Sequence, residues 1–168
     1  MEEKVIVKSE RRMSSTALFI SCVFAIVGIG LTIAYSSGIL SGVQYIQRAP
    51  FTVPNWLVIA LPPVLFAHQA IALFLTLRQN VYSRELRSVR NATWVFQVLL
   101  FLTLAFLPYF VWGGMLTAAF AVATVSAALA LGAMILTYRQ TIGGGVLMTI
   151  LFLVTALIML YLGYWTFA

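Results

Sequence analysis

The sequence contains no aspartate, and its four acidic residues are glutamates that lie outside every long apolar stretch. Proton- and sodium-coupled transporters usually keep carboxylates at membrane depth to couple ion movement, and hydrolytic enzymes use paired carboxylates as acid and base. Neither arrangement is available here. The glycines at 143–145 are not followed by lysine, so they do not form a phosphate loop, and no enzyme activity is expected. The glutamates are Glu2, Glu3, Glu10 and Glu85.

Cysteine and charge are also scarce. The one cysteine, Cys22, lies in an apolar stretch, which excludes an internal disulfide and a cysteine-rich metal site. Charged residues make up 8% of the chain and hydrophobic residues 62%, whereas a soluble domain is about 25% charged. A soluble protein is therefore excluded. The net charge of +6 does not indicate nucleic-acid binding, because the basic residues stand at the ends of apolar stretches, as membrane topology requires.

Five apolar stretches are long enough to cross a bilayer, which takes about 20 helical residues. Helices are predicted at 16–35, 53–77, 92–111, 115–138 and 146–167. A loop at 36–52, a basic loop at 78–90, a tight turn at Gly113-Gly114 and a glycine-rich break at 139–145 join them. The sequence predicts an all-α integral membrane protein in which residues 1–168 form one five-transmembrane-helix bundle, multi-pass in the inner or plasma membrane.

Basic residues fall almost entirely on one side of this predicted bundle. Arg48 alone lies on the other side. By the positive-inside rule, the N-terminus is expected in the cytoplasm and the C-terminus outside. The first stretch exceeds the roughly 7–15 apolar residues of a signal peptide, so it is expected to be retained. The residues on the basic side are Lys4, Lys8, Arg11, Arg12, Arg78, Arg84, Arg87, Arg90 and Arg139.

Small residues recur at helical spacing in the fourth stretch. Such residues let helices approach closely in lipid, so they predict a packing face or a subunit contact. They are Ala119, Ala123, Ser126, Ala127 and Ala130.

Two polar residues within the predicted spans are candidates for binding. His68 lies beside Gln69 in the second span, beyond Pro62 and Pro63, which are expected to kink the helix. Three roles are open for His68: a hydrogen bond to a buried neighbour, contact with a ligand such as a tetrapyrrole or quinone, or axial ligation of haem. Gln97 in the third span needs a partner on another helix or on a ligand.

Aromatic and proline residues around the second span carry a family resemblance. The run at 48–56 reads Arg-Ala-Pro-Phe-Thr-Val-Pro-Asn-Trp, and the third span begins Trp-Val-Phe-Gln at 94–97. With five helices in a chain of this length, these runs resemble the TspO/translocator protein family, also called tryptophan-rich sensory proteins. Val53 stands at the family's second proline, and the Pro-Tyr of the fifth helix is absent from 150–160.

The resemblance implies a pocket that opens toward the first loop, binds porphyrins or sterol-like lipids and usually occurs in a homodimer. The ligand-binding residues expected from it are Phe51, Trp56, His68, Trp94 and Gln97. No motif in the sequence requires a cofactor. The resemblance implies porphyrin, haem or a bound lipid as the ligand. The alternative hypothesis is a non-catalytic accessory subunit of a larger respiratory or oxidase-type membrane complex that contacts haem, quinone or lipid.

Overall fold

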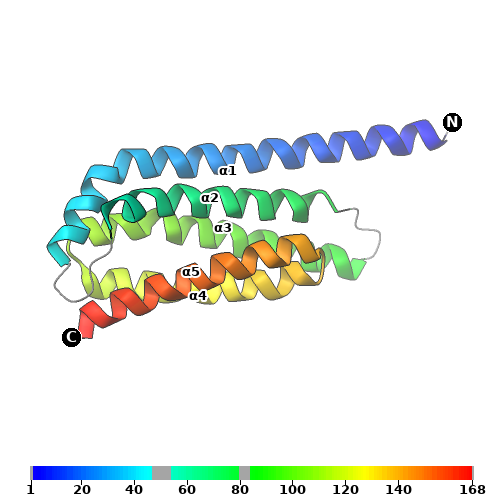
Figure 1. Cartoon of the computed structure of the whole chain (residues 1–168). Coiled ribbons are helices and arrows are strands. Elements are labelled where there is room, and N and C mark those ends of the chain that lie inside the picture. Colours follow the sequence, from blue (N-terminus) through cyan, green and yellow to red (C-terminus); the bar gives the residue numbers. More distant parts are fainter. Residues whose placement is uncertain (1, 47–53, 80–83, 168) are drawn as a thin grey trace.

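The computed structural model describes the backbone of residues 2–46, 54–79 and 84–167, and their side chains except those of 2–14, 37 and 39–46. The described chain is helical throughout, with short connections (Figure 1). This confirms the predicted all-α fold. The helices are α1 (Glu2–Ile46), α2 (Asn55–Leu77), α3 (Arg84–Trp112), α4 (Leu116–Tyr138) and α5 (Ile142–Phe167).

Each of the five helices contains a segment that is long and apolar enough to cross a membrane. Large apolar side chains face outward along these segments, for example Phe19 and Ile26, which are each 70% exposed. Continuous apolar surface of this kind is stable in lipid and not in water. The chain is therefore a multi-pass membrane protein with five candidate spans, as predicted.

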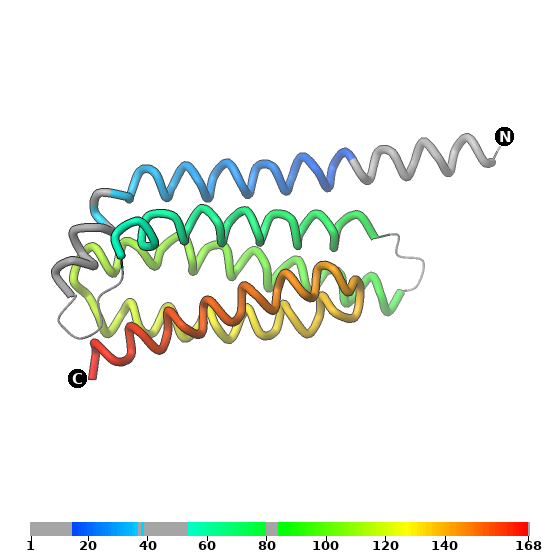
Figure 2. The backbone as a smooth tube through the Cα atoms, in the orientation of Figure 1, coloured from blue at the N-terminus to red at the C-terminus, as the bar shows by residue number. Residues whose placement is uncertain are grey.

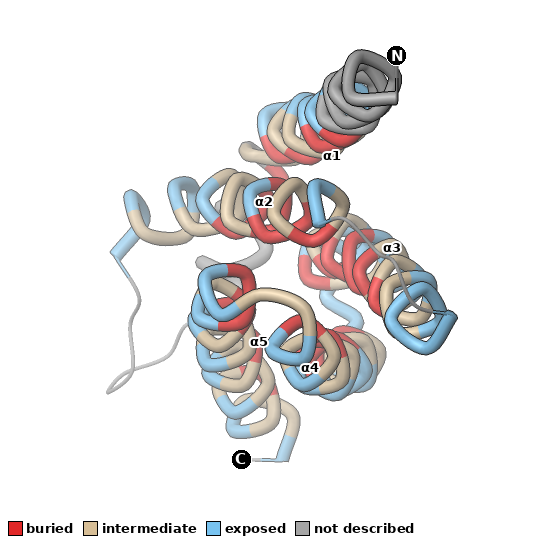
Figure 3. Tube along the Cα trace, turned by 90° about the vertical axis from the view of Figure 1, so that its right-hand side faces the viewer, coloured by how far each residue is buried: buried red, intermediate tan, exposed pale blue. Residues whose placement is uncertain are grey.

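The helices run side by side and alternate in direction (Figure 2). In the end-on view, α2, α3, α4 and α5 surround a common core, and α1 lies outside against α2 and α3 (Figure 3). Three aromatic pairs of described residues join α1 to α3: Phe24 with Phe101 at a ring-centroid distance of 4.6 Å, Phe24 with Trp94 at 5.7 Å, and Tyr35 with Trp112 at 6.4 Å. With an odd number of helices, the two termini lie at opposite ends of the bundle (Figure 1).

The alanines of α4 form a packing face within the chain. Ala119 and Ala130 are fully buried, and Ala123 is nearly so. They pack between α3 and α5: Ala130 lies in the core cluster that holds Leu100 and Met148. Ala119 and Ala123 lie in a second cluster with residues such as Leu162. The prediction of a helix-packing face is confirmed, and this face is used inside the chain.

Both predicted ends of the first helix and the predicted start of the third were wrong, because they were drawn from apolarity and a helix continues beyond the membrane wherever no residue stops it. The first helix is 45 residues long and extends on both sides of the predicted 16–35, while its apolar segment, Ser15–Ser36, agrees with that prediction. Helix α3 begins at Arg84, inside the predicted basic loop. Its first turn consists of good helix formers such as arginine, glutamate and leucine.

The glycines at 143–145 lie inside α5, which begins at Ile142 and not at 146. A Cβ atom at Gly145 would overlap the ring of Tyr138, and one at Gly144 would lie 2.8 Å from a Thr137 methyl carbon. These glycines therefore permit the close start of α5 against the end of α4, where a flexible break was predicted. The predicted tight turn at Gly113-Gly114 is confirmed, since Gly114 has φ of 67°, a conformation that favours glycine.

Candidate functional site

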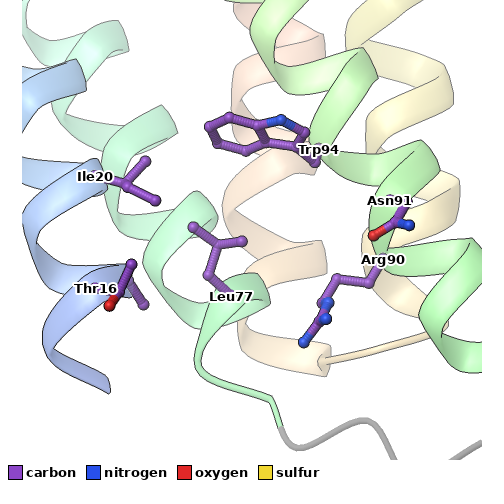
Figure 4. A pocket seen from close by; sticks show the side chains of 7 residues that line it. Thr16, Ile20, Leu77, Arg90, Asn91 and Trp94 are labelled. Carbon is purple, nitrogen blue, oxygen red and sulfur yellow. The ribbon is translucent and has the colours of Figure 1, made fainter. Parts of the chain in front are cut away.

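A pocket of about 540 Å³ lies between α1, α2 and α3 at the end of the bundle that carries the described arginines, here called the basic end. Trp94 and Arg90 extend from α3 toward α1 and α2 (Figure 4). Leu77, the last residue of α2, lies between the lining side chains of α1 and those of α3 (Figure 4). One part of the lining is apolar and the other is polar. The lining residues are Thr16, Ala17, Ile20, Leu77, Arg90, Asn91 and Trp94.

Trp94 is the predicted site residue that lines this pocket. Its ring packs against Phe24 of α1, which in turn lies 4.6 Å from the ring of Phe101 between centroids. This aromatic stack fixes the indole where α1 crosses α3. The helix contact thus forms one wall of the pocket.

Arg90 and Asn91 supply the polar part of the lining from the first turns of α3. Arg90 is half-buried, and no described residue forms an ion pair or hydrogen bond with its side chain. Glu85 is the one carboxylate whose side chain is described, and it is exposed at the start of α3. The pocket therefore presents a positive charge that no neighbouring acid neutralises within the described part of the chain.

Gln97 lies one turn beyond Trp94 but points into the core of the bundle. Its side chain is fully buried, and neither amide atom has a hydrogen-bond partner in the described chain. The Nε2 of Gln69, also fully buried, donates a 2.6 Å hydrogen bond to the backbone carbonyl oxygen of Gln97. The two glutamines form a polar contact between α2 and α3 that is separate from the pocket lining.

His68 is half-buried on α2, and its Nδ1 lies 3.2 Å from the backbone oxygen of Val64, one turn earlier in the same helix. Among the described residues, no group of three or more His, Cys, Asp or Glu is placed to hold a metal ion. The helix is continuous through Pro62 and Pro63. This contact lies within the residue's own helix, and Val64 is itself exposed, so it is not the hydrogen bond to a buried neighbour, and the three roles open for His68 stay predictions.

Trp56 belongs to the other end of the bundle. Trp56 is 68% exposed in the first turn of α2, and Phe51 lies outside the described residues. Trp56 precedes Gln69 by thirteen positions, which is roughly 20 Å along a helix. Since Gln69 contacts Gln97, one turn from Trp94, the structure does not bring Trp56 and Trp94 to one site.

The site residues predicted from the sequence do not include Arg90, Asn91 or Thr16. A local signal was present, because an arginine and an asparagine stand one turn before a tryptophan at the edge of an apolar stretch. The α1 wall had no such signal. Its residues Ala17 and Ile20 look like any other apolar positions until the helix is placed against α3.

The fold and this pocket define the class: a five-helix, multi-pass membrane protein with a cavity at the basic end, between its peripheral helix and its four-helix core. Comparison of the chain with protein-family models, with curated proteins and with solved structures finds no match in any of the three.

Proposed function

We propose that this protein binds a hydrophobic small molecule, a tetrapyrrole or a sterol-like lipid, in the pocket between α1, α2 and α3, in the manner of a TspO-like protein. The observation that carries the proposal is the pocket itself. Its volume of about 540 Å³ falls within the roughly 300–1,000 Å³ typical of small-molecule sites. Binding, with or without release on the other side of the membrane, is the activity proposed.

The lining supports a ligand with a flat or elongated apolar body. Trp94, Ile20 and Leu77 offer ring and aliphatic surface, and aromatic side chains bury large areas with defined stacking geometry. Since the pocket lies within helices that face lipid, a membrane-dissolved molecule reaches it by lateral diffusion.

The pocket differs from the TspO-like expectation in its location. The resemblance implies an opening toward the first loop, at the end where Trp56 lies, whereas the described pocket is at the basic end. The loop residues 47–53 lie outside the described chain, so the proposal rests on the basic-end pocket. Trp94 is the residue of the resemblance that contributes to it.

The test is a titration of purified protein with protoporphyrin, haem and a sterol, followed by tryptophan fluorescence and by absorbance. Saturable quenching by at least one ligand is expected. Absence of saturable binding by all three would contradict the proposal. With haem, a Soret band that disappears in His68→Ala would instead assign axial ligation to that residue.

The accessory-subunit alternative is supported by the outer face of α1. Phe19, Ile26 and Ile33 are each about 70% exposed there, and α1 itself packs mainly on α2 and α3. The alanine face of α4 does not support it, because that face is buried within the chain. Purification in a mild detergent decides the matter: a chain that always elutes alone or as a homodimer contradicts this alternative.

A further inference from the structure

Arg90 places a positive charge at the polar side of a largely apolar pocket. The residue is half-buried on α3 and has no ion-pair partner in the described chain. A guanidinium carries five donors in a planar fork that matches the oxygens of carboxylates and phosphates. Partial burial removes some of its hydration, so an anion that enters the pocket gains more from Arg90 than from a fully exposed arginine.

Asn91 and Thr16 add two polar side chains to the same lining, one from α3 and one from α1. The amide of Asn91 provides further donors for an oxyanion. Thr16 lies beside Ile20 on α1, Leu77 lies between α1 and Arg90, and Trp94 lies further along α3 (Figure 4). The pocket therefore divides into a cationic part and an apolar part, which is the division found in an amphipathic ligand.

The pocket also lies near the ends of the apolar segments of α2 and α3, the level at which lipid headgroups are expected. Arg90 stands near the start of the span in α3, and Leu77 ends α2. Arg78 and Arg139 follow the ends of α2 and α4 at the same end of the bundle. Basic pockets between membrane helices at such a level bind anionic lipid headgroups in other proteins.

We propose that the ligand of this pocket carries an oxyanion, either a lipid phosphate or a tetrapyrrole carboxylate. The oxyanion lies against Arg90 and Asn91, and the apolar body lies against Trp94, Ile20 and Leu77. This inference rests on the proposed function and adds the charge and orientation of the ligand. Neutral sterols lack the group that Arg90 selects.

The experiment compares two matched pairs of probes on the full chain in detergent micelles. The first pair is a short-chain phosphatidic acid and the diacylglycerol with the same chains. The second is protoporphyrin IX and its dimethyl ester. The two members of each pair differ in the anionic group. Inorganic phosphate alone tests whether the site binds free anions.

The anionic member of at least one pair is expected to bind roughly tenfold more tightly, the size of one charge-assisted hydrogen bond. Arg90→Gln should remove this preference, and Arg90→Lys should keep part of it. Arg139→Gln is the matched control, because Arg139 is exposed at the basic end and outside the pocket lining. It should bind like the wild-type protein.

The pair that shows the preference identifies the source of the oxyanion. A preference for phosphatidic acid indicates a lipid phosphate, and a preference for protoporphyrin IX indicates a tetrapyrrole carboxylate. Equal affinity within both pairs, or a preference that survives Arg90→Gln, overturns the inference and leaves the proposed function intact. Displacement of the ligands by inorganic phosphate at similar concentration also overturns it, because the site would then recognise a free anion. Failure of every probe and of a sterol to bind would contradict the proposed function as well. Size-exclusion profiles of the variants establish that each is folded.

Discussion

The Nε2 of Gln69 donates a 2.6 Å hydrogen bond to the backbone carbonyl oxygen of Gln97, which joins α2 to α3 in the core of the bundle. Both side chains are fully buried. The Oε1 of Gln69 and both amide atoms of Gln97 have no hydrogen-bond partner in the described chain. A buried amide without partners costs about 1–3 kcal/mol, so this contact carries a local energetic penalty.

The first prediction follows from that penalty. Gln97→Met keeps the length of the side chain and removes two unpartnered atoms, so it should raise the free energy of unfolding by about 1 kcal/mol or more. Gln69→Met is the matched variant. Its free energy of unfolding should rise less, because this substitution also removes the hydrogen bond to the Gln97 carbonyl on α3. Thermal unfolding in detergent measures both. A marked loss of stability in Gln97→Met would mean that the amide has a partner, such as a buried water molecule.

A second prediction concerns the contact between α1 and α2. A Cβ atom at Gly28 would overlap the ring of Phe66, whereas a Cβ at Gly30 would have no neighbour within 4 Å. Gly28→Ala should therefore destabilise the protein by about 1–3 kcal/mol, because the ring has to move within a packed core. Gly30→Ala should be neutral or slightly stabilising, since alanine favours a helix by about 1 kcal/mol over glycine.

The two glycine variants are compared by thermal unfolding in the same detergent. Equal effects of Gly28→Ala and Gly30→Ala would contradict the described packing of α1 against Phe66. Gly28 and Gly30 are two positions apart on α1, so the two substitutions lie at nearly the same depth in the membrane.

A third prediction tests the alanine face of α4. Ala130 is fully buried in the main core cluster, and Ala128 is exposed on the same helix. Ala130→Leu adds three carbons to a filled space and should lower stability by about 1–3 kcal/mol or more. Ala128→Leu places the same atoms against lipid and should be tolerated. If Ala128→Leu were the damaging variant, the inward face of α4 would be assigned to the wrong side.

The sequence predicted those features that depend on local pattern. Apolar length predicted five spans, small residues predicted the inward face around Ala130, and the glycine pair predicted the turn with φ of 67° at Gly114. Apolarity did not predict that α1 continues to Ile46 or that α3 begins at Arg84, because polar helix formers extend a helix outside the membrane.

The pocket could not be predicted in the same way, because it depends on how separate helices meet. Ala17 and Ile20 become lining residues only when α1 packs beside Trp94. Trp56 was predicted as a ligand-binding residue because it follows a proline-rich segment. In the structure it lies in the first turn of α2, away from the basic end. The relative depth of residues on different helices is fixed by contacts such as that between Gln69 and Gln97.

The central claim, that ligand binds at the basic end of the bundle, is tested most directly by two single-tryptophan proteins. One retains Trp94 and the other Trp56, with the remaining tryptophans changed to phenylalanine. During titration with the ligand that binds the wild-type protein, the Trp94 protein should be quenched saturably, because this indole lines the pocket. The Trp56 protein should be quenched markedly less at the same concentrations, because this indole lies away from the pocket. Saturable quenching of Trp56 with no response from Trp94 would contradict the account and place the site beside the first loop.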